Sequence, residues 1–138
     1  MRPRLPLGLI ALTLFVVSLV VPALDVETPQ LFTKSLHTET MYGFQCLALG
    51  YLVLPAWLAN PLWAIGMVLH AARRKKPAIS MLLLALIAAV SSPLVLTSME
   101  GYRLVDLHIG YFAWLASIAT TLAIGIRGER PQDMLPPT

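Results

Sequence analysis

The chain has 138 residues, of which 57% are hydrophobic and only 12% are charged, and its formal net charge is +3. A water-soluble domain of this length normally carries about twice that charged fraction, so the composition argues against an ordinary soluble fold. The basic residues stand at the ends of apolar blocks instead of along one face, which argues against nucleic-acid binding.

Four apolar blocks follow one another along the chain. A helix needs about 20 apolar residues to cross a bilayer core that is roughly 30 Å thick. The second block is long by roughly a third, so we expect it to tilt, to kink or to begin as an interfacial segment. The blocks predict an all-α integral membrane protein, with one domain over residues 1–127. The four expected transmembrane helices are 5–24, 43–72, 78–99 and 109–126.

The lysine and arginine residues predict the orientation of these helices. Eight of the ten lie in the N-terminal tip, in the loop between the second and third helices, and in the C-terminal tail. Cytoplasmic segments carry such an excess of positive charge. We therefore expect two hairpins, two outward loops and both termini in the cytoplasm. The tail, residues 128–138, is proline-rich and is expected to be disordered.

The first block has a second interpretation, and the loop after it is polar. The basic start, the apolar run and the small residues ending at Ala23 resemble a secretory signal. Cleavage there would leave three spans, but the run is long for a signal and Pro22 lies close to the cut. The outward loop Asp25–Met41 is too short for a domain, and its apolar residues would let it lie on the membrane or cap the bundle.

The pair Asn60-Pro61 lies inside the second expected helix. Pro61 has no amide proton and its ring frees the carbonyl four residues earlier, at Trp57. Membrane helices tolerate such a break where neighbouring groups satisfy the freed carbonyl. Asn60 has two amide donors and one acceptor, so it can donate to that carbonyl or to another helix.

The third expected helix has a related site, Ser91-Ser92-Pro93, where the hydroxyls can serve carbonyls freed by Pro93. We expect Asn60 to bond one of these serines, at about 0.5–2 kcal/mol. The structural interpretation is a kink with an interhelical bond, and the functional one is a polar substrate or ion site near the midplane. The candidate cluster comprises Trp57, Asn60, Pro61, Trp63, Ser91 and Ser92.

The tryptophans differ in their expected depth. Trp57 and Trp63 lie well inside the second expected helix, where an indole N–H needs a partner that the polar cluster could supply. Trp114 and Tyr111 lie nearer the outer boundary, as residues of the aromatic belt do. Core packing and anchoring are the expected roles.

The basic block closes the second expected helix. We expect it to fix the orientation of the chain, and it could also bind anionic lipid head groups, at roughly 1 kcal/mol per basic residue. The block consists of Arg73, Arg74, Lys75 and Lys76.

The other chemistry-bearing residues form no site by spacing. Cys46 is the single cysteine, which excludes an intramolecular disulfide, and we expect it to be a small core residue. His37 and His108 lie in outward loops and could hold a metal only with Asp106 or Glu100. No catalytic set, phosphate loop or mid-span charge is visible. We therefore expect neither an enzyme nor a cofactor.

Two short motifs resemble a pattern in small uncharacterised bacterial inner-membrane proteins with four helices. In that pattern Trp-x-Ala-Asn-Pro precedes a basic turn, and Gly-Tyr-x-x-Trp-x-x-Ser opens the last helix. The resemblance implies a bacterial cytoplasmic membrane and no particular activity. The matching residues are Trp57, Ala59, Asn60, Pro61, Gly110, Tyr111, Trp114 and Ser117.

These observations favour a non-enzymatic membrane protein that acts as an accessory subunit of a larger membrane complex, through helix and loop contacts with another membrane protein. The expected partners are the lipid bilayer and such a membrane protein, or, in place of that protein, further copies of the chain. The alternative is a small oligomeric transporter or channel component, with a polar midplane site at Asn60, Ser91 and Ser92. A third interpretation is an enzyme or redox subunit that uses His37 and His108.

Overall fold

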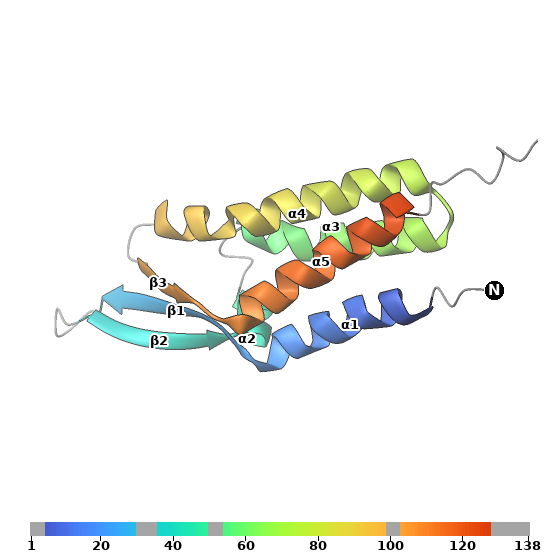
Figure 1. The fold of residues 1–138 in the computed structure, drawn as a ribbon. Coiled ribbons are helices and arrows are strands. Elements are labelled where there is room, and N and C mark those ends of the chain that lie inside the picture. Colours follow the sequence, from blue (N-terminus) through green and yellow to red (C-terminus); the bar gives the residue numbers. More distant parts are fainter. Residues whose placement is uncertain (1–4, 30–35, 50–53, 99–102, 128–138) are drawn as a thin grey trace, which may run out of the picture.

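A computed structural model describes residues 5–29, 36–49, 54–98 and 103–127 of the chain. Four helices of the described part, α1, α3, α4 and α5, run side by side, and a small sheet extends from one end of them (Figure 1). The described elements, in chain order, are α1 (Leu5–Val20), β1 (Pro22–Pro29), β2 (Leu36–Tyr42), α2 (Gly43–Leu49), α3 (Leu54–Ala71), α4 (Lys75–Ser98), β3 (Arg103–Leu107) and α5 (Ile109–Arg127).

The prediction of an all-α protein with four transmembrane helices in two hairpins is wrong. Within the described residues, two helices, α4 and α5, are long and apolar enough to cross a membrane. Core helices of water-soluble proteins can have the same length and hydropathy, so membrane insertion stays a prediction. The helix pairs also differ, because α1 packs against α5 and α3 packs against α4.

The expected helix 43–72 is divided into α2 and α3. Pro55 stands in the first turn of α3, where a helix tolerates proline because the missing amide proton would have had no partner there. Pro61 lies inside α3 and Pro93 lies inside α4. The expected helices 78–99 and 109–126 differ little from α4 and α5. The expected tail, residues 128–138, lies outside the described residues.

The expected outward loops form an antiparallel sheet with the strand order β2-β1-β3. Asp25 of β1 lies opposite Thr40 of β2 and Asp106 of β3. Ala23 and Val26 of β1 are both buried although they are three residues apart. Irregularities in the two registers shift the alternation of faces along this strand. The hairpin therefore shows no period of two in the sequence.

The core of the described part lies among α3, α4 and α5. The buried residues of α4 recur every three or four positions, so they form one stripe along the helix. Three of them are alanines, and such small residues let neighbouring helices approach closely. Leu82 and Ile118 are the large apolar side chains that are fully buried there. The stripe on α4 comprises Ala78, Leu82, Ala85 and Ala89.

Candidate functional site

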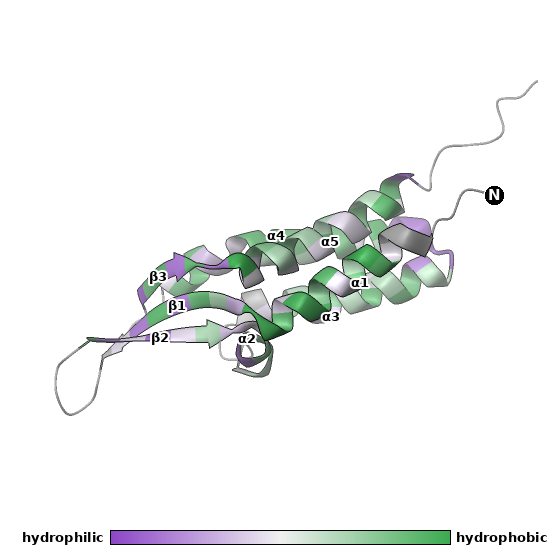
Figure 2. Cartoon of the chain, turned by 60° about the horizontal axis from the view of Figure 1, so that its bottom comes forward, coloured by the Kyte–Doolittle hydropathy of each residue, from purple (hydrophilic) through white to green (hydrophobic). Residues whose placement is uncertain are grey.

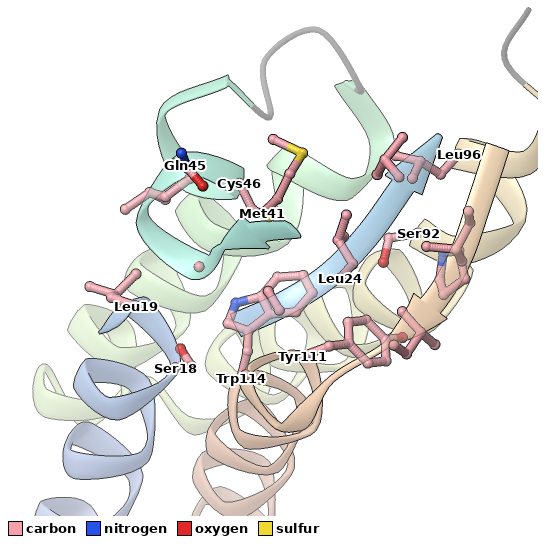
Figure 3. A pocket seen from close by; sticks show the side chains of 18 of the residues that line it. Ser18, Leu19, Leu24, Met41, Gln45, Cys46, Ser92, Leu96, Tyr111 and Trp114 are labelled. Carbon is pink, nitrogen blue, oxygen red and sulfur yellow. The ribbon is translucent and has the colours of Figure 1, made fainter. Parts of the chain in front are cut away.

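A cavity of about 350 Å³ lies where the helices meet the sheet. Parts of all five described helices and all three strands line it, and Figure 3 shows a part of this wall. Its volume falls within the range of small-molecule sites, roughly 300–1,000 Å³. Most of the lining side chains are apolar, and a few polar groups stand among them. This combination is typical of a binding site for an apolar molecule.

Aromatic side chains form much of the inner wall. Tyr111 and Trp114 come from the first turns of α5, and their ring centroids are 6.1 Å apart. Trp57 of α3 and Phe15 of α1 line the same cavity. Tyr111 is buried and both side chains face the cavity (Figure 3), so the structure gives them a role in its wall, and their position in an aromatic belt stays a prediction.

Asn60 bonds a neighbouring helix, but the predicted bond to a serine of α4 is wrong. The indole Nε1 of Trp114 donates a hydrogen bond of 2.9 Å to Oδ1 of Asn60. The contact joins α3 to α5 instead of joining α3 to a serine of α4. An indole N–H can only donate, so it fixes the amide oxygen toward Trp114 and leaves the NH₂ group for another acceptor.

The serines of α4 bond within their own helix. Ser91 donates to the carbonyl of Ala88 at 3.0 Å, and Ser92 donates to the carbonyl of Ala89 at 2.7 Å. The carbonyl of Ala89 is the one that Pro93 frees, four residues later. The prediction that a serine serves this carbonyl is confirmed. Tyr111 is a second donor to the same oxygen, at 3.0 Å.

The predicted polar cluster is divided between two places. Trp57, Asn60 and Ser92 line the cavity, whereas Trp63 lies in the core. The indole of Trp63 stacks on Phe15, with ring centroids 4.6 Å apart, and donates to Oγ1 of Thr121 at 3.1 Å. Pro61 and Ser91 are not among the residues of the cavity wall. The sequence analysis did not predict the cavity. The one feature that could have indicated it is the pair of aromatic residues, one helical turn apart, in the Gly-Tyr-x-x-Trp motif.

Four wall residues come from α2, and Gln45 and Cys46 are the two among them with polar or ionisable side chains. Gln45 accepts a hydrogen bond of 2.8 Å from the backbone N–H of Tyr42 through its Oε1 atom. Cys46 is half-buried, and desolvation by burial raises its pKa to about 11. The thiol is therefore protonated at neutral pH and adds an apolar, unreactive surface to the wall.

The basic block spans the turn between α3 and α4 and the first two residues of α4, at the end of the bundle opposite the sheet (Figure 1). Arg73 has a φ of 60°, and its backbone N–H bonds the carbonyl of His70 at 3.0 Å. Arg73, Arg74, Lys75 and Lys76 are all exposed. The predicted contact with anionic lipid stays a prediction.

The two loop histidines do not come together. Nε2 of His108 lies 2.9 Å from Oδ2 of Asp25, beside the start of α5. His37 pairs in register with Thr28, three positions further along β1. Within the described residues no group of three metal-ligating side chains is present, and Glu100 lies outside them. The metal site that combined His37 with His108 is therefore wrong for this structure.

Lowering the pH from about 5 to about 2 is expected to destabilise the protein through Asp25. The Thr40 hydroxyl and then the His108 ring hold the pKa of Asp25 below its ordinary value. The ionised carboxylate therefore stabilises the fold above that ordinary value, roughly pH 3.9, and the effect is lost as the pH falls through the lowered pKa. Melting temperatures of the wild type and Asp25→Asn across this range test it. Parallel curves for the two proteins would show that Asp25 has no such role.

The structure is a helical bundle with a three-stranded sheet at one end. Between the bundle and the sheet lies a cavity large enough for a small molecule. No protein-family model matches the chain, and no match to a curated protein or to a solved structure was found. The resemblance to small bacterial membrane proteins therefore stays a prediction.

Proposed function

We propose that this chain is a non-enzymatic integral membrane protein that acts as an accessory subunit of a larger membrane complex. The observation that carries the proposal is a bundle of hydrophobic helices (Figure 2) that exposes many large apolar side chains and ends in a small sheet, whose two outer strands each have a side that pairs with no described strand. The bundle provides the membrane part, and the sheet provides the surface for a partner protein.

The outer face of α4 supports a membrane environment. A helix on the surface of a soluble protein places polar residues outward, but α4 exposes large apolar side chains along most of its length. Its 24 residues give a length of about 36 Å, enough for a bilayer core of roughly 30 Å. The exposed apolar residues of this helix are Leu83, Leu84, Ile87, Val90 and Leu94.

The charges support an orientation for the two candidate spans. The basic block lies at the start of α4 and Arg127 ends α5, so these cations share one end of the bundle. The sheet lies at the other end (Figure 1). Positive charge gathers on the cytoplasmic side of membrane proteins, which supports an orientation with the sheet outside. The proposed location is the cytoplasmic membrane of a bacterium, as the resemblance implies.

The edges of the sheet support a way of binding the partner. β1 is the central strand, so β2 and β3 each have one side that pairs with no described strand. Such an edge offers a row of backbone donors and acceptors to a strand of another protein. All but one of the side chains of β2 are exposed, so this strand lies at the surface of the described part.

Purification from the native membrane in mild detergent, through a C-terminal tag, tests the proposal. We expect mass spectrometry to identify a stoichiometric membrane partner. His37→Pro and Thr38→Pro then test the edge of β2, because neighbouring amides of a strand point to opposite sides. One of the two prolines therefore removes an amide N–H that points away from β1, and the other removes an N–H that bonds β1. The variant that keeps the wild-type melting temperature is the first kind.

The expected result is that the partner is lost in the proline variant that keeps the wild-type melting temperature. Retention of the partner in that variant would exclude the edge of β2 as the contact. A clean homo-oligomer without a second protein would contradict the accessory role.

The alternative of a small oligomeric transporter or channel component has one observation in its favour, since Asn60 and Ser92 both line the cavity. The hydroxyls of Ser91 and Ser92 are, however, used by carbonyls of their own helix. They cannot donate to a substrate at the same time, so a polar site built on these three residues is weaker than the sequence suggests.

A further inference from the structure

We propose that the cavity between the bundle and the sheet binds one neutral, apolar molecule that carries a carbonyl oxygen, and that this oxygen accepts a hydrogen bond from the amide of Asn60. This role goes beyond that of an accessory subunit. It rests on the size of the cavity, the charge of its wall and the fixed orientation of two carboxamides.

The volume sets the size of the ligand. The interior of a protein is close-packed, and voids larger than a water molecule are few. A water molecule occupies roughly 30 Å³ of the liquid, so a cavity of about 350 Å³ has room for about a dozen atoms of that size. A medium-length acyl chain or a single substituted ring fills such a space.

The charge of the wall excludes an anionic ligand. Glu39 is the only charged residue among those that line the cavity in the described part of the chain, and no lysine or arginine is among them. The basic block lies at the opposite end of the bundle (Figure 1). A carboxylate or phosphate would enter an apolar space without a counter-charge, which is costly.

The two carboxamides of the wall determine what the ligand must offer. Asn60 and Gln45 each have their side-chain oxygen held by a group that can only donate, namely the Trp114 indole and a backbone N–H. Neither NH₂ group donates to any described residue. Both amides therefore offer donors and lack acceptors, and a ligand carbonyl supplies what is missing.

The hydroxyls of the wall support the same conclusion. Ser92 and Tyr111 both use their protons on the carbonyl of Ala89. They add no donor to the cavity, whereas the two amides keep theirs for a ligand oxygen. Around these donors stand aromatic and aliphatic side chains, which suit the apolar body of the ligand (Figure 3). A fatty-acyl ester and a small quinone share this chemistry.

Native mass spectrometry of the full chain in mild detergent tests the proposal with defined probes. Methyl decanoate represents the acyl esters and duroquinone represents the quinones. Undecane lacks the acceptor, and decanoate carries a negative charge. We expect a saturable 1:1 adduct with at least one of the two carbonyl probes, and weaker binding of undecane and decanoate. An adduct with one carbonyl probe alone identifies the source of the carbonyl.

Two adjacent serines provide a matched pair of variants. Ser92→Leu fills the cavity, whereas Ser91→Leu changes a serine with the same kind of intrahelical bond outside the wall. We expect binding to be lost in Ser92→Leu and kept in Ser91→Leu. Leu96→Trp fills the cavity from the next turn of α4 and serves if Ser92→Leu does not fold. Equal binding in wild type and a folded cavity-filling variant would overturn the proposal.

Asn60→Leu tests the hydrogen bond. It keeps the size of the side chain and removes the donor, so binding of the carbonyl probe should weaken by roughly 2–10-fold, as the loss of one hydrogen bond does. Binding of undecane should not weaken. Undecane or decanoate binding as tightly as the carbonyl probes, or no adduct with either carbonyl probe, would overturn the proposal.

Discussion

Replacing Gly110 with alanine is expected to lower the melting temperature of the protein by about 4–12 °C, which corresponds to about 1–3 kcal/mol of overpacking. A Cβ atom at this position would lie 2.6 Å from the carbonyl oxygen of Pro22 and 3.0 Å from that of Val21. Both are backbone atoms at the joint between α1 and β1. They cannot move aside as the end of a flexible side chain does.

Gly43 makes a second close contact with the same joint. A Cβ atom there would meet the backbone carbonyl of Ser18, and the N–H of Gly43 bonds the carbonyl of Val21 at 3.3 Å. The N–H of His108 bonds the carbonyl of Ala23 at 2.9 Å. The starts of α2 and α5 therefore contact the backbone of the segment that joins α1 to β1. Gly43→Ala should destabilise the protein at least as much as Gly110→Ala.

Gly8→Ala is the matched control for these two variants. Nothing lies within 4 Å of a Cβ atom built at Gly8, which is inside α1. Alanine is a better helix former than glycine, so this change should stabilise the protein by about 0.5–1 kcal/mol or leave it unchanged. Thermal unfolding followed by circular dichroism measures all three. Equal melting temperatures for Gly8→Ala and Gly110→Ala would contradict the close contact at the joint.

The sequence predicted the interactions that are local. The serines before Pro93 were expected to serve the carbonyls that it frees, and Ser92 does so, three residues away along one helix. The expected bounds of α4 and α5 were close because long apolar runs determine helices by themselves. These features depend on neighbours along the chain, so the spacing of residues is sufficient to infer them.

The features that were missed depend on distant residues. Asn60 and Trp114 are 54 positions apart. The apolar helices are built from so few residue types that the sequence does not show which two helices pack against each other. The hairpin was taken for loops because its buried residues, Ala23 and Val26, do not alternate with polar ones. Irregularities in the register of β1 produce the three-residue spacing of Ala23 and Val26, and no sequence pattern predicts them. The cavity lies between these two missed features.

Leu82→Ala is expected to lower the free energy of unfolding by about 2–4 kcal/mol, because it leaves a cavity in the core. Leu82 is fully buried, and its side chain lies between two glycines of neighbouring helices. A Cβ atom at Gly66 of α3 would lie 2.7 Å from Cγ of Leu82, and one at Gly125 of α5 would lie 3.9 Å from its Cδ1. Rigid helix backbones cannot close the space that the truncation opens.

Leu83→Ala is the control, since the next residue of the same helix is half exposed, with a relative accessibility of 48%. Lipid is as apolar as leucine, and in water a scattered surface leucine contributes little, so the change should stay within about 0.5 kcal/mol. Denaturant titration in mild detergent measures both variants. Similar losses for Leu82→Ala and Leu83→Ala would contradict the packing of α4 described above.

A double variant gives the sharper test, because it distinguishes the loss of a particular contact from a general weakening. Gly66→Ala alone should destabilise the protein, as its new methyl group would press on Leu82. In the Leu82→Ala background the same methyl group enters the space that the leucine has left. The combined loss should therefore be smaller than the sum of the two single losses by about 1 kcal/mol or more. Strict additivity would mean that these residues of α3 and α4 do not touch.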